Sequence, residues 1–322
     1  PIWWGEQACE IGYHAVTFSQ RVFLMDAKQT RLGVLLALAA YFIWGIAPAY
    51  FKVIWYVPAD EILTHRVIWS FFFMLALISV SRQWKSVKTL LQTPKKILLL
   101  AVSAVLVGGN WLLFIWAVNH NHMLEASLGY FINPLVNILL GMLFLGERFR
   151  RMQWLAVILA ALGVLVQLWT FGSLPVIALG LAFSFAFYGL LRKKIAVEAQ
   201  TGMLIETLWL LPVAAIWLFG ITDSPTSHMS QNSLSLNLLL IAAGVVTTVP
   251  LLCFTGAATR LRLSTLGFFQ YIGPTLMFLL AVTFYGEHPG ADKMVTFGFI
   301  WVALAIFVMD ALYTQRALRK TR

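Results

Sequence analysis

Glu61 and His65 are residues whose types and spacing suit proton chemistry. They are four positions apart, so on a helix they share one face and can come into contact. They lie at the edge of an apolar run, and ionisable side chains within such a span are costly and usually functional. A carboxylate beside an imidazole can take up and release a proton near neutral pH. The alternative is a structural ion cluster that fixes the helix, with Arg66 paired to Glu61 or Glu125.

Glu206 is a second carboxylate inside an apolar run. If the chain consists of two inverted halves, as argued below, Glu206 is the counterpart of Glu61 near the opposite membrane face. One carboxylate near each face would suit a site that is approached alternately from the two sides. A structural pair of Glu206 with Arg192 or Lys194 is an equally good alternative.

Tyr130, Asn133 and Asn137 occur at positions i, i+3 and i+7, which places them on one helix face. Pro134 cannot donate an intrahelical hydrogen bond, so it frees the backbone carbonyl of Tyr130. Polar side chains and a free carbonyl on one inward face could bind a substrate. Alternatively, the asparagines join neighbouring helices and the proline only bends its own.

Aromatic side chains are numerous near the middles of the apolar runs. An aromatic cavity would suit aromatic or flat amphipathic substrates, although packing is the default role of any single ring. Together with the polar face they form our candidate substrate-binding set: Trp44, Trp69, Asn110, Trp111, Tyr130, Asn133, Asn137, Tyr188, Gln270 and Tyr271. The candidate kink residues are Pro48, Pro134 and Pro274, the last of which frees the carbonyl of Gln270.

The sequence contains no enzyme signature of the common kinds. HExxH, GxSxG and the phosphate-binding GxxxxGK[ST] pattern are all absent from it. Cys9 and Cys253 occur in unrelated surroundings, so we expect neither a disulfide framework nor a metal site. No cofactor is expected, and ATP-driven transport within this chain is disfavoured.

The composition is that of a polytopic membrane protein. Hydrophobic residues make up 60% of the chain and charged residues 11%, against about 25% charged in soluble domains. The net charge of +10 comes from short basic clusters between apolar runs, which is typical of membrane-protein loops and not of nucleic-acid binding. We expect ten spans, near residues 32–51 (interrupted late by Pro48), 62–81, 97–118, 126–146, 152–170, 175–191, 203–221, 237–257, 263–285 and 294–312.

The distribution of Lys and Arg predicts the orientation of these spans. Of the 23 basic residues, all except Lys52, Arg66 and Lys293 fall in alternate loops, on one side of the membrane. By the positive-inside rule that side is the cytoplasm, and both termini lie there.

One stretch occurs twice, at residues 130–149 and 270–289. The two copies share a proline followed twelve residues later by Gly-Glu: Pro134 with Gly146-Glu147, and Pro274 with Gly286-Glu287. Because each half has an odd number of spans, the halves are inverted relative to each other. The predicted fold is thus an all-α membrane protein with ten transmembrane helices arranged as two inverted five-helix repeats, residues 25–171 and 172–322. Residues 1–24 precede Met25, show no signal-peptide pattern and are expected to be a non-native or upstream extension.

These paired halves resemble the EamA-type members of the drug/metabolite transporter superfamily. Four stretches, FIWGIAPAYFK (42–52), EILTHRVIWS (61–70), LEASLGYFINPLVN (124–137) and LGFFQYIGP (266–274), are similar to one subfamily of bacterial inner-membrane permeases associated with chloramphenicol sensitivity. The resemblance extends from Met25 to the C-terminus and implies ten helices with both termini inside.

The leading hypothesis is a secondary transporter of small metabolites or drugs that works by alternating access of its inverted repeats and exports its substrate. The alternatives are an integral-membrane enzyme that uses Glu61, His65 and Glu206, and a membrane scaffold that transports nothing. The expected partners are an unidentified small molecule, protons and the lipid bilayer. The chain is expected to act as a monomer or a homodimer.

Overall fold

A computed structural model describes residues 5–120, 122–284, 288 and 290–320, and in this part of the chain all regular secondary structure is helical. The helices are α1 (Gly5–Val53), α2 (Ala59–Val80), α3 (Trp84–Leu91), α4 (Pro94–Asn119), α5 (Met123–Leu145), α6 (Arg151–Phe171), α7 (Val176–Ile195), α8 (Ala199–Gly220), α9 (Leu234–Ala258), α10 (Leu263–Gln270), α11 (Ile272–Thr283) and α12 (Ala291–Lys320).

Ten segments of the described residues are long and apolar enough to cross a membrane, which confirms the expected number of spans. Each predicted span overlaps one of them. The ninth consists of α10 and the first part of α11, and α3 is a short amphipathic helix between the second and third spans. Helices suit this setting because every backbone N–H and C=O group within the hydrocarbon must find a partner inside its own segment.

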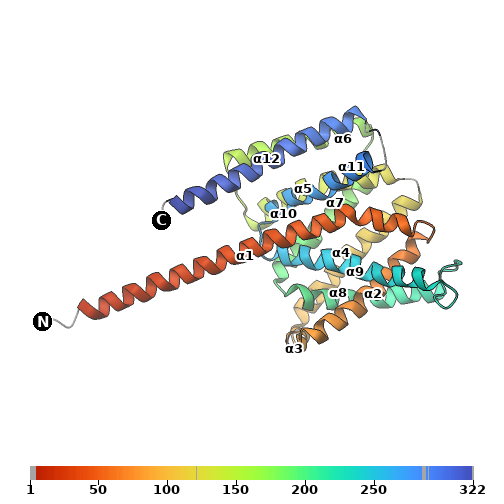
Figure 1. The fold of residues 1–322 in the computed structure, drawn as a ribbon, viewed down its shortest axis with the longest axis horizontal. Helices are drawn as coiled ribbons and strands as arrows, with labels where there is room; N and C mark the ends of the chain where they lie inside the picture. Colours follow the sequence, from red (N-terminus) through yellow and green to blue (C-terminus); the bar gives the residue numbers. More distant parts are fainter. Residues whose placement is uncertain (1–4, 121, 285–287, 289, 321–322) are drawn as a thin grey trace.

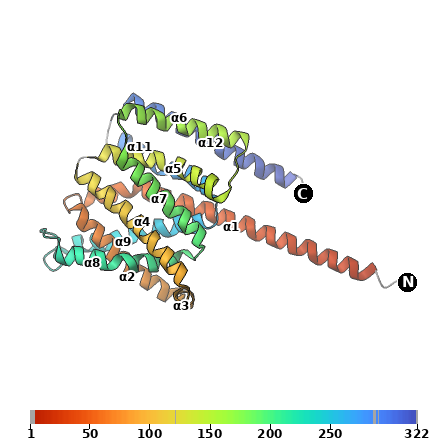
Figure 2. The same cartoon turned by 180° about the vertical axis from the view of Figure 1, so that it is seen from behind.

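The helices form a bundle in which α6 and α12 lie side by side along one edge (Figures 1 and 2). In the rest of the bundle, α5 packs on α7 and α10, α2 packs on α8 and α9, and α1 packs on α9 and α11. Helix α4 packs on α7 and α8. The first part of α1 extends well beyond the other helices, and α1 begins at the same end of the bundle at which α12 finishes (Figure 1).

The fifth and sixth spans are joined by a tight turn, which fits the short gap between the expected spans 152–170 and 175–191. Helix α6 ends at Phe171, and Gly172 follows with a left-handed φ of 75°. Glycine adopts this conformation without steric strain, so it ends the helix and reverses the chain. Helix α7 then begins at Val176.

The prolines act differently in different helices. Helix α1 continues unbroken past Pro48, so the expected interruption of the first span there is wrong. Pro48 lies on an exposed face close to the end of α1, where the loss of one backbone hydrogen bond disturbs little of the helix. Helix α5 also continues past Pro134.

The ninth span, by contrast, is divided. Helix α10 ends at Gln270 and α11 begins at Ile272, so Tyr271 lies between the two helices. The break falls where Pro274 leaves the Gln270 carbonyl without its intrahelical donor.

Glu147, from the repeated Gly-Glu pair, positions the start of α10. Its carboxylate accepts hydrogen bonds from the backbone N–H groups of Leu263 (2.6 Å) and Ser264 (3.0 Å), and from the Ser264 hydroxyl (2.5 Å). An acidic group at a helix N-terminus satisfies unpaired N–H donors and interacts favourably with the helix dipole. The pair Gly286-Glu287 of the second copy lies outside the described residues.

Helices α2 and α9 cross very closely at Gly244. A Cβ atom added to Gly244 would stand 2.5 Å from the carbonyl carbon of Trp69, and the Gly244 carbonyl accepts a hydrogen bond from Ser70 Oγ at 3.1 Å. Small residues at such crossings let helix backbones approach, which is a main source of stability between membrane helices.

We expect Gly244→Val to destabilise the protein by about 1–3 kcal/mol, because the added side chain forces α2 and α9 apart. The measurement is thermal unfolding of the purified protein in detergent. Gly298→Val is the matched control, since a Cβ at Gly298 would meet nothing within 4 Å. Equal stability of the two variants would contradict this account of the crossing.

We expect Glu147→Ala to cost about 1–2 kcal/mol, because two N–H groups at the start of α10 lose their acceptor. The same unfolding assay measures it. Glu198→Ala is the control: Glu198 is exposed, and its carboxylate accepts from the Gln83 side chain. The capping role is refuted if both variants unfold at the same temperature.

Candidate functional site

Glu61 lies in the first turn of α2 and is completely buried. Its carboxylate accepts hydrogen bonds from Ser224 Oγ (2.5 Å) and Thr226 Oγ1 (2.9 Å), in the segment that follows α8. His65 is also buried, and its Nε2 stands 4.0 Å from Glu61 Oε1, which is beyond hydrogen-bond length. Among the described residues neither of these two atoms has a hydrogen-bond partner. We call these four residues the Glu61 cluster.

Trp69 extends this cluster by one helical turn. Its indole Nε1 donates to His65 Nδ1 at 3.3 Å, so the second ring nitrogen of the histidine acts as an acceptor. A neutral imidazole with Nδ1 as acceptor carries its proton on Nε2, the nitrogen that faces Glu61. The cluster thus contains a carboxylate and an imidazole N–H that approach each other in a site shielded from lipid.

Glu206 of α8 forms a second buried site with Arg192 of α7. Arg192 Nε is 3.6 Å from Glu206 Oε1, and both side chains are fully buried. The hydroxyl of Ser103 on α4 donates to Oε1, and that of Tyr188 donates to Oε2 at 3.5 Å. We call these four residues the Glu206 cluster. The structural pair with Arg192, left open by the sequence, is present.

Gly202 makes room for this ion pair. A side chain at position 202 would collide with the Arg192 guanidinium. Lys194, the other partner that the sequence offered, lies instead over the Phe144 ring, with Nζ 5.3 Å from the ring centroid.

The Glu61 and Glu206 clusters lie towards opposite ends of the paired helices α2 and α8. The start of α2 is joined to the end of α8 by a hydrogen bond from Trp217 Nε1 to Asp60 (3.2 Å). The other ends are joined by Gln83 and Glu198 (2.8 Å). At 1.5 Å per residue, roughly 20 Å of α8 separates Glu206 from the end that contacts Glu61. The two carboxylates therefore do not belong to one acid–base site.

The predicted amide face is brought together and already hydrogen-bonded. Asn137 Nδ2 donates to Asn133 Oδ1 (3.1 Å) and to Gln270 Oε1 (2.9 Å), and Asn133 Nδ2 donates to the Ala182 carbonyl (2.5 Å). These bonds join α5 to α7 and α10, which corresponds to the helix-joining alternative. Substrate binding by these amides stays a prediction.

Tyr130 does not join that network. Its side chain is 39% exposed, and its ring lies edge-on to Phe114 of α4 at 6.1 Å. Tyr130 and Pro274 line a cavity of about 350 Å³ between α5, α6, α11 and α12, whose lining also includes Gln167, Phe278 and Asp292.

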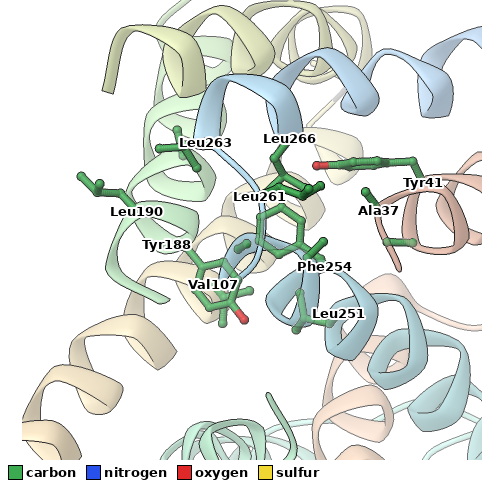
Figure 3. Packing of buried hydrophobic residues seen from close by; sticks show 14 of the residues in the cluster. Ala37, Tyr41, Val107, Tyr188, Leu190, Leu251, Phe254, Leu261, Leu263 and Leu266 are labelled. Atoms are coloured by element: carbon green, nitrogen blue, oxygen red, sulfur yellow. The ribbon is translucent and has the colours of Figure 1, made fainter. Parts of the chain in front are cut away.

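Trp44 and Tyr188 meet in one aromatic cluster centred on Phe254 of α9, a residue that sequence reasoning missed. The Phe254 ring centroid is 5.9 Å from that of Trp44, 6.0 Å from that of Tyr188 and 5.0 Å from that of Phe185. Figure 3 shows Tyr188 and Phe254 side by side among the apolar side chains of several helices. Phe254 lies in a uniformly apolar run, so its sequence surroundings carry no signal of this role.

The remaining candidates are dispersed. Tyr271 is buried in a different apolar cluster and donates to the Phe131 carbonyl at 3.3 Å. Asn110 of α4 donates to the Leu181 carbonyl (2.9 Å) and to Ser184 Oγ (2.8 Å) on α7. Its neighbour Trp111 lies against Arg66.

Arg66 has neither partner that the sequence suggested. Glu61 belongs to its own cluster, and Glu125 accepts from the backbone N–H of Ile177 at the start of α7 (2.7 Å). Arg66 Nε instead donates to Thr247 Oγ1 on α9 at 2.8 Å.

Comparison with known proteins identifies relatives along most of the chain. The family described as the EamA-like transporter family matches residues 31–169. Protein RarD of Salmonella typhimurium is 90% identical over 292 residues, which cover 91% of this chain and 99% of the relative. An uncharacterized transporter of Vibrio cholerae is 62% identical, with 92% of this chain and 98% of the relative covered.

A solved structure titled "Crystal structure of protein" has a similar fold. Its TM-score is 0.69 at 17% sequence identity, and the match covers 88% of this chain and 98% of the other.

We expect Arg192→Met to destabilise the protein by about 3–5 kcal/mol, because it leaves the Glu206 carboxylate buried without its cation. The double variant Arg192→Met/Glu206→Gln is expected to recover most of that loss, since the amide oxygen can accept from the Ser103 hydroxyl and the amide NH2 can donate to the Tyr188 hydroxyl oxygen. Thermal unfolding in detergent compares the wild type, both single variants and the double variant. A double variant no more stable than Arg192→Met would show that the pair is not coupled.

Proposed function

The chain belongs with the RarD proteins to the EamA-like transporter family, and from this premise we propose that it is a secondary transporter that exports small metabolites or drugs by alternating access. The observation that carries the mechanism is the placement of two buried carboxylates, Glu61 and Glu206, towards opposite ends of α2 and α8. Ionisable residues inside a membrane protein usually mark ion or substrate pathways. Their separation favours a transporter over an enzyme with a single acid–base site.

The packing of the helices supports two repeats, residues 25–171 and 172–322. If α1, α2, α4, α5 and α6 of the first half correspond to α7, α8, α9, α10–α11 and α12 of the second, the most extensive contacts between helices have counterparts. Thus α1 on α9 corresponds to α7 on α4, and α2 on α9 corresponds to α8 on α4. The pairs α2–α8, α5–α10 and α6–α12 each correspond to themselves. This is the pattern expected of halves related by a pseudo-two-fold axis.

The charged loops support an orientation with both termini in the cytoplasm. Helix α1 begins and α12 finishes at the same end of the bundle (Figure 1), and the basic loops of the sequence fall on one side of the spans. All relatives described above come from bacteria. We therefore propose a multi-pass protein of the bacterial inner membrane, in which one chain holds a complete pathway and a homodimer is not required.

In this mechanism the two clusters take up protons in turn. Protonation of Glu206 removes the charge that pairs with Arg192 and so loosens the contact between α7 and α8. Protonation of Glu61 removes the charge that the Ser224 and Thr226 hydroxyls stabilise at the other end. Each protonation thus changes the stability of the helix contacts at one end of the bundle. Such a change is required if two halves rock about a central site. The central site is formed by the aromatic and amide residues, with Trp44, Trp111, Tyr130 and Asn133 among its members.

The test is transport by purified protein in liposomes loaded with a pH-sensitive dye. Amino acids, aromatic metabolites and chloramphenicol are supplied under an imposed proton gradient. We expect at least one solute to cause proton flux, and we expect Glu206→Gln and Glu61→Gln to reduce that flux at least tenfold while the proteins remain folded.

Glu198→Gln is the matched control, because this exposed carboxylate is outside both clusters. Solute-driven proton flux that persists unchanged in both cluster variants would reject the coupling role of Glu61 and Glu206 but leave transport in place. If no solute moves under any gradient, the transporter proposal is refuted.

A further inference from the structure

Arg66 is a cation inside the second membrane span, Ala59–Val80. A charged side chain at such a position is costly in hydrocarbon and is normally paired with an opposite charge or directed into a polar cavity. The sequence offered Glu61 and Glu125 as partners, and the structure uses both carboxylates elsewhere. Another intramembrane carboxylate, Glu206, is paired with Arg192. Within the described part of the chain, Arg66 therefore takes part in no ion pair.

The contacts that Arg66 does make hold it in one position. Its Nε donates to Thr247 Oγ1 at 2.8 Å, and that hydroxyl in turn donates to the Ala243 carbonyl at 2.7 Å, so it is oriented as an acceptor. The guanidinium carbon lies 5.0 Å from the ring centroid of Trp111 and 5.4 Å from that of Phe51. Helices α1, α4 and α9 thus hold one side chain of α2.

These contacts leave the binding edge of the guanidinium free. Aromatic rings interact with the cation through their faces, whereas carboxylates bind to the in-plane N–H groups. Of the five N–H donors only that of Nε has a partner among the described residues. Part of the Arg66 surface remains accessible, as do parts of Phe51 and Trp111. The two Nη groups therefore form an unoccupied fork of the kind that binds a carboxylate through two parallel hydrogen bonds.

Tyr130 connects this cation with open space. The phenol groups of Tyr130 and Tyr50 lie within electrostatic range of the guanidinium, and Tyr130 also lines the cavity of about 350 Å³ described above. Tyr50 donates its hydroxyl hydrogen to the Leu239 carbonyl, so this phenol is held by α9. The aromatic rings of Phe51 and Trp111 lie beside the guanidinium.

We propose that Arg66 is the anion-binding residue of the central site, and that the transported substrate is a small organic acid with a carboxylate and an aromatic or apolar body. The carboxylate binds to the two Nη groups, and the body lies between Trp111 and Tyr130. The bound anion neutralises a cation inside the second span that takes part in no ion pair among the described residues, which lowers the cost of keeping that charge in the membrane. The inference rests on the proposed transport function for the claim that this ligand is the substrate.

The first test measures the charge preference of the site without a known ligand. Tyr130→Cys is introduced into a background with Cys9→Ser and Cys253→Ser. Its reaction rates are measured with two methanethiosulfonates of similar size, one carrying a sulfonate and the other a trimethylammonium group. We expect the sulfonate reagent to react faster than the trimethylammonium reagent. The ratio of the first rate to the second should fall about tenfold in Arg66→Gln, because one nearby positive charge is removed from a medium of intermediate dielectric. Arg66→Lys should retain the preference.

Lys293→Gln is the matched control, because Lys293 is a cation that lines the same cavity as Tyr130. If Lys293→Gln lowers the ratio as much as Arg66→Gln does, or if the ratio is unchanged in Arg66→Gln, the role of Arg66 is refuted.

The second test addresses the carboxylate directly. Binding to the folded state raises the apparent unfolding temperature by mass action, so thermal shifts report occupancy. We expect phenylacetate and indole-3-acetate to raise the unfolding temperature of the wild type. The neutral phenylacetamide and indole-3-acetamide should need at least a tenfold higher concentration to produce the same rise. Arg66→Gln should lose the difference, and Arg66→Lys should keep part of it because lysine presents a point charge and not a fork. Equal shifts for acids and amides, shifts that persist in Arg66→Gln, or no shift with either acid overturn the assignment.

These outcomes are separable from those of the transport assay. A charge preference that depends on Arg66, together with liposomes that move no solute, would refute transport and retain the anion site. Proton flux driven by a solute, without any charge preference at Tyr130→Cys, would retain transport and refute the anion site.

Discussion

The structure depends on one constraint: inside the hydrocarbon of a membrane there is no water to satisfy a polar or charged group. Each such group must find its partner within the protein, and in a bundle of helices that partner usually lies on another helix. The polar side chains of this chain are therefore also the points at which its helices are joined. Ser70 binds the backbone of α9, Asn110 binds the backbone of α7, and Asn137 of α5 binds Gln270 of α10.

The same constraint explains where the acidic residues lie. Glu147 and Glu125 satisfy backbone N–H groups at the starts of α10 and α7, where a helix has donors without intrahelical acceptors. Glu61 and Glu206 are placed within spans and need side-chain partners, which they find in hydroxyl groups and, for Glu206, in Arg192. The first two carboxylates fix helix positions. The contacts of Glu61 and Glu206 depend mainly on the negative charge of the carboxylate, which protonation removes. These two residues therefore suit a role in a change of helix packing.

Arg66 is an exception to this pairing among the described residues. Two aromatic rings and one threonine hold its guanidinium, and none of these neutralises the charge. Such an arrangement is costly in hydrocarbon, and an anion bound to the guanidinium would lower that cost. The proposed transport function offers a reason for leaving this guanidinium without an opposite charge. An anionic substrate would supply that charge while bound and remove it on release. In the aromatic cluster close to the Glu206 cluster, by contrast, Phe254 and Tyr188 are fully buried.

The amino-acid sequence by itself determined the number of spans and the membrane class of the protein, because apolar runs of bilayer length act locally. It also pointed to Glu61, His65 and Glu206, since ionisable residues stand out in an apolar background. Only the tertiary structure decided which partner each of them has. Pairing depends on residues far apart in the chain, such as Ser224 with Glu61 or Thr247 with Arg66, and their own neighbours in sequence carry no trace of the contact. Likewise Pro48 and Pro274 have the same intrinsic effect on a backbone, and it is their position in the packed bundle that leaves α1 whole and divides the ninth span at Tyr271.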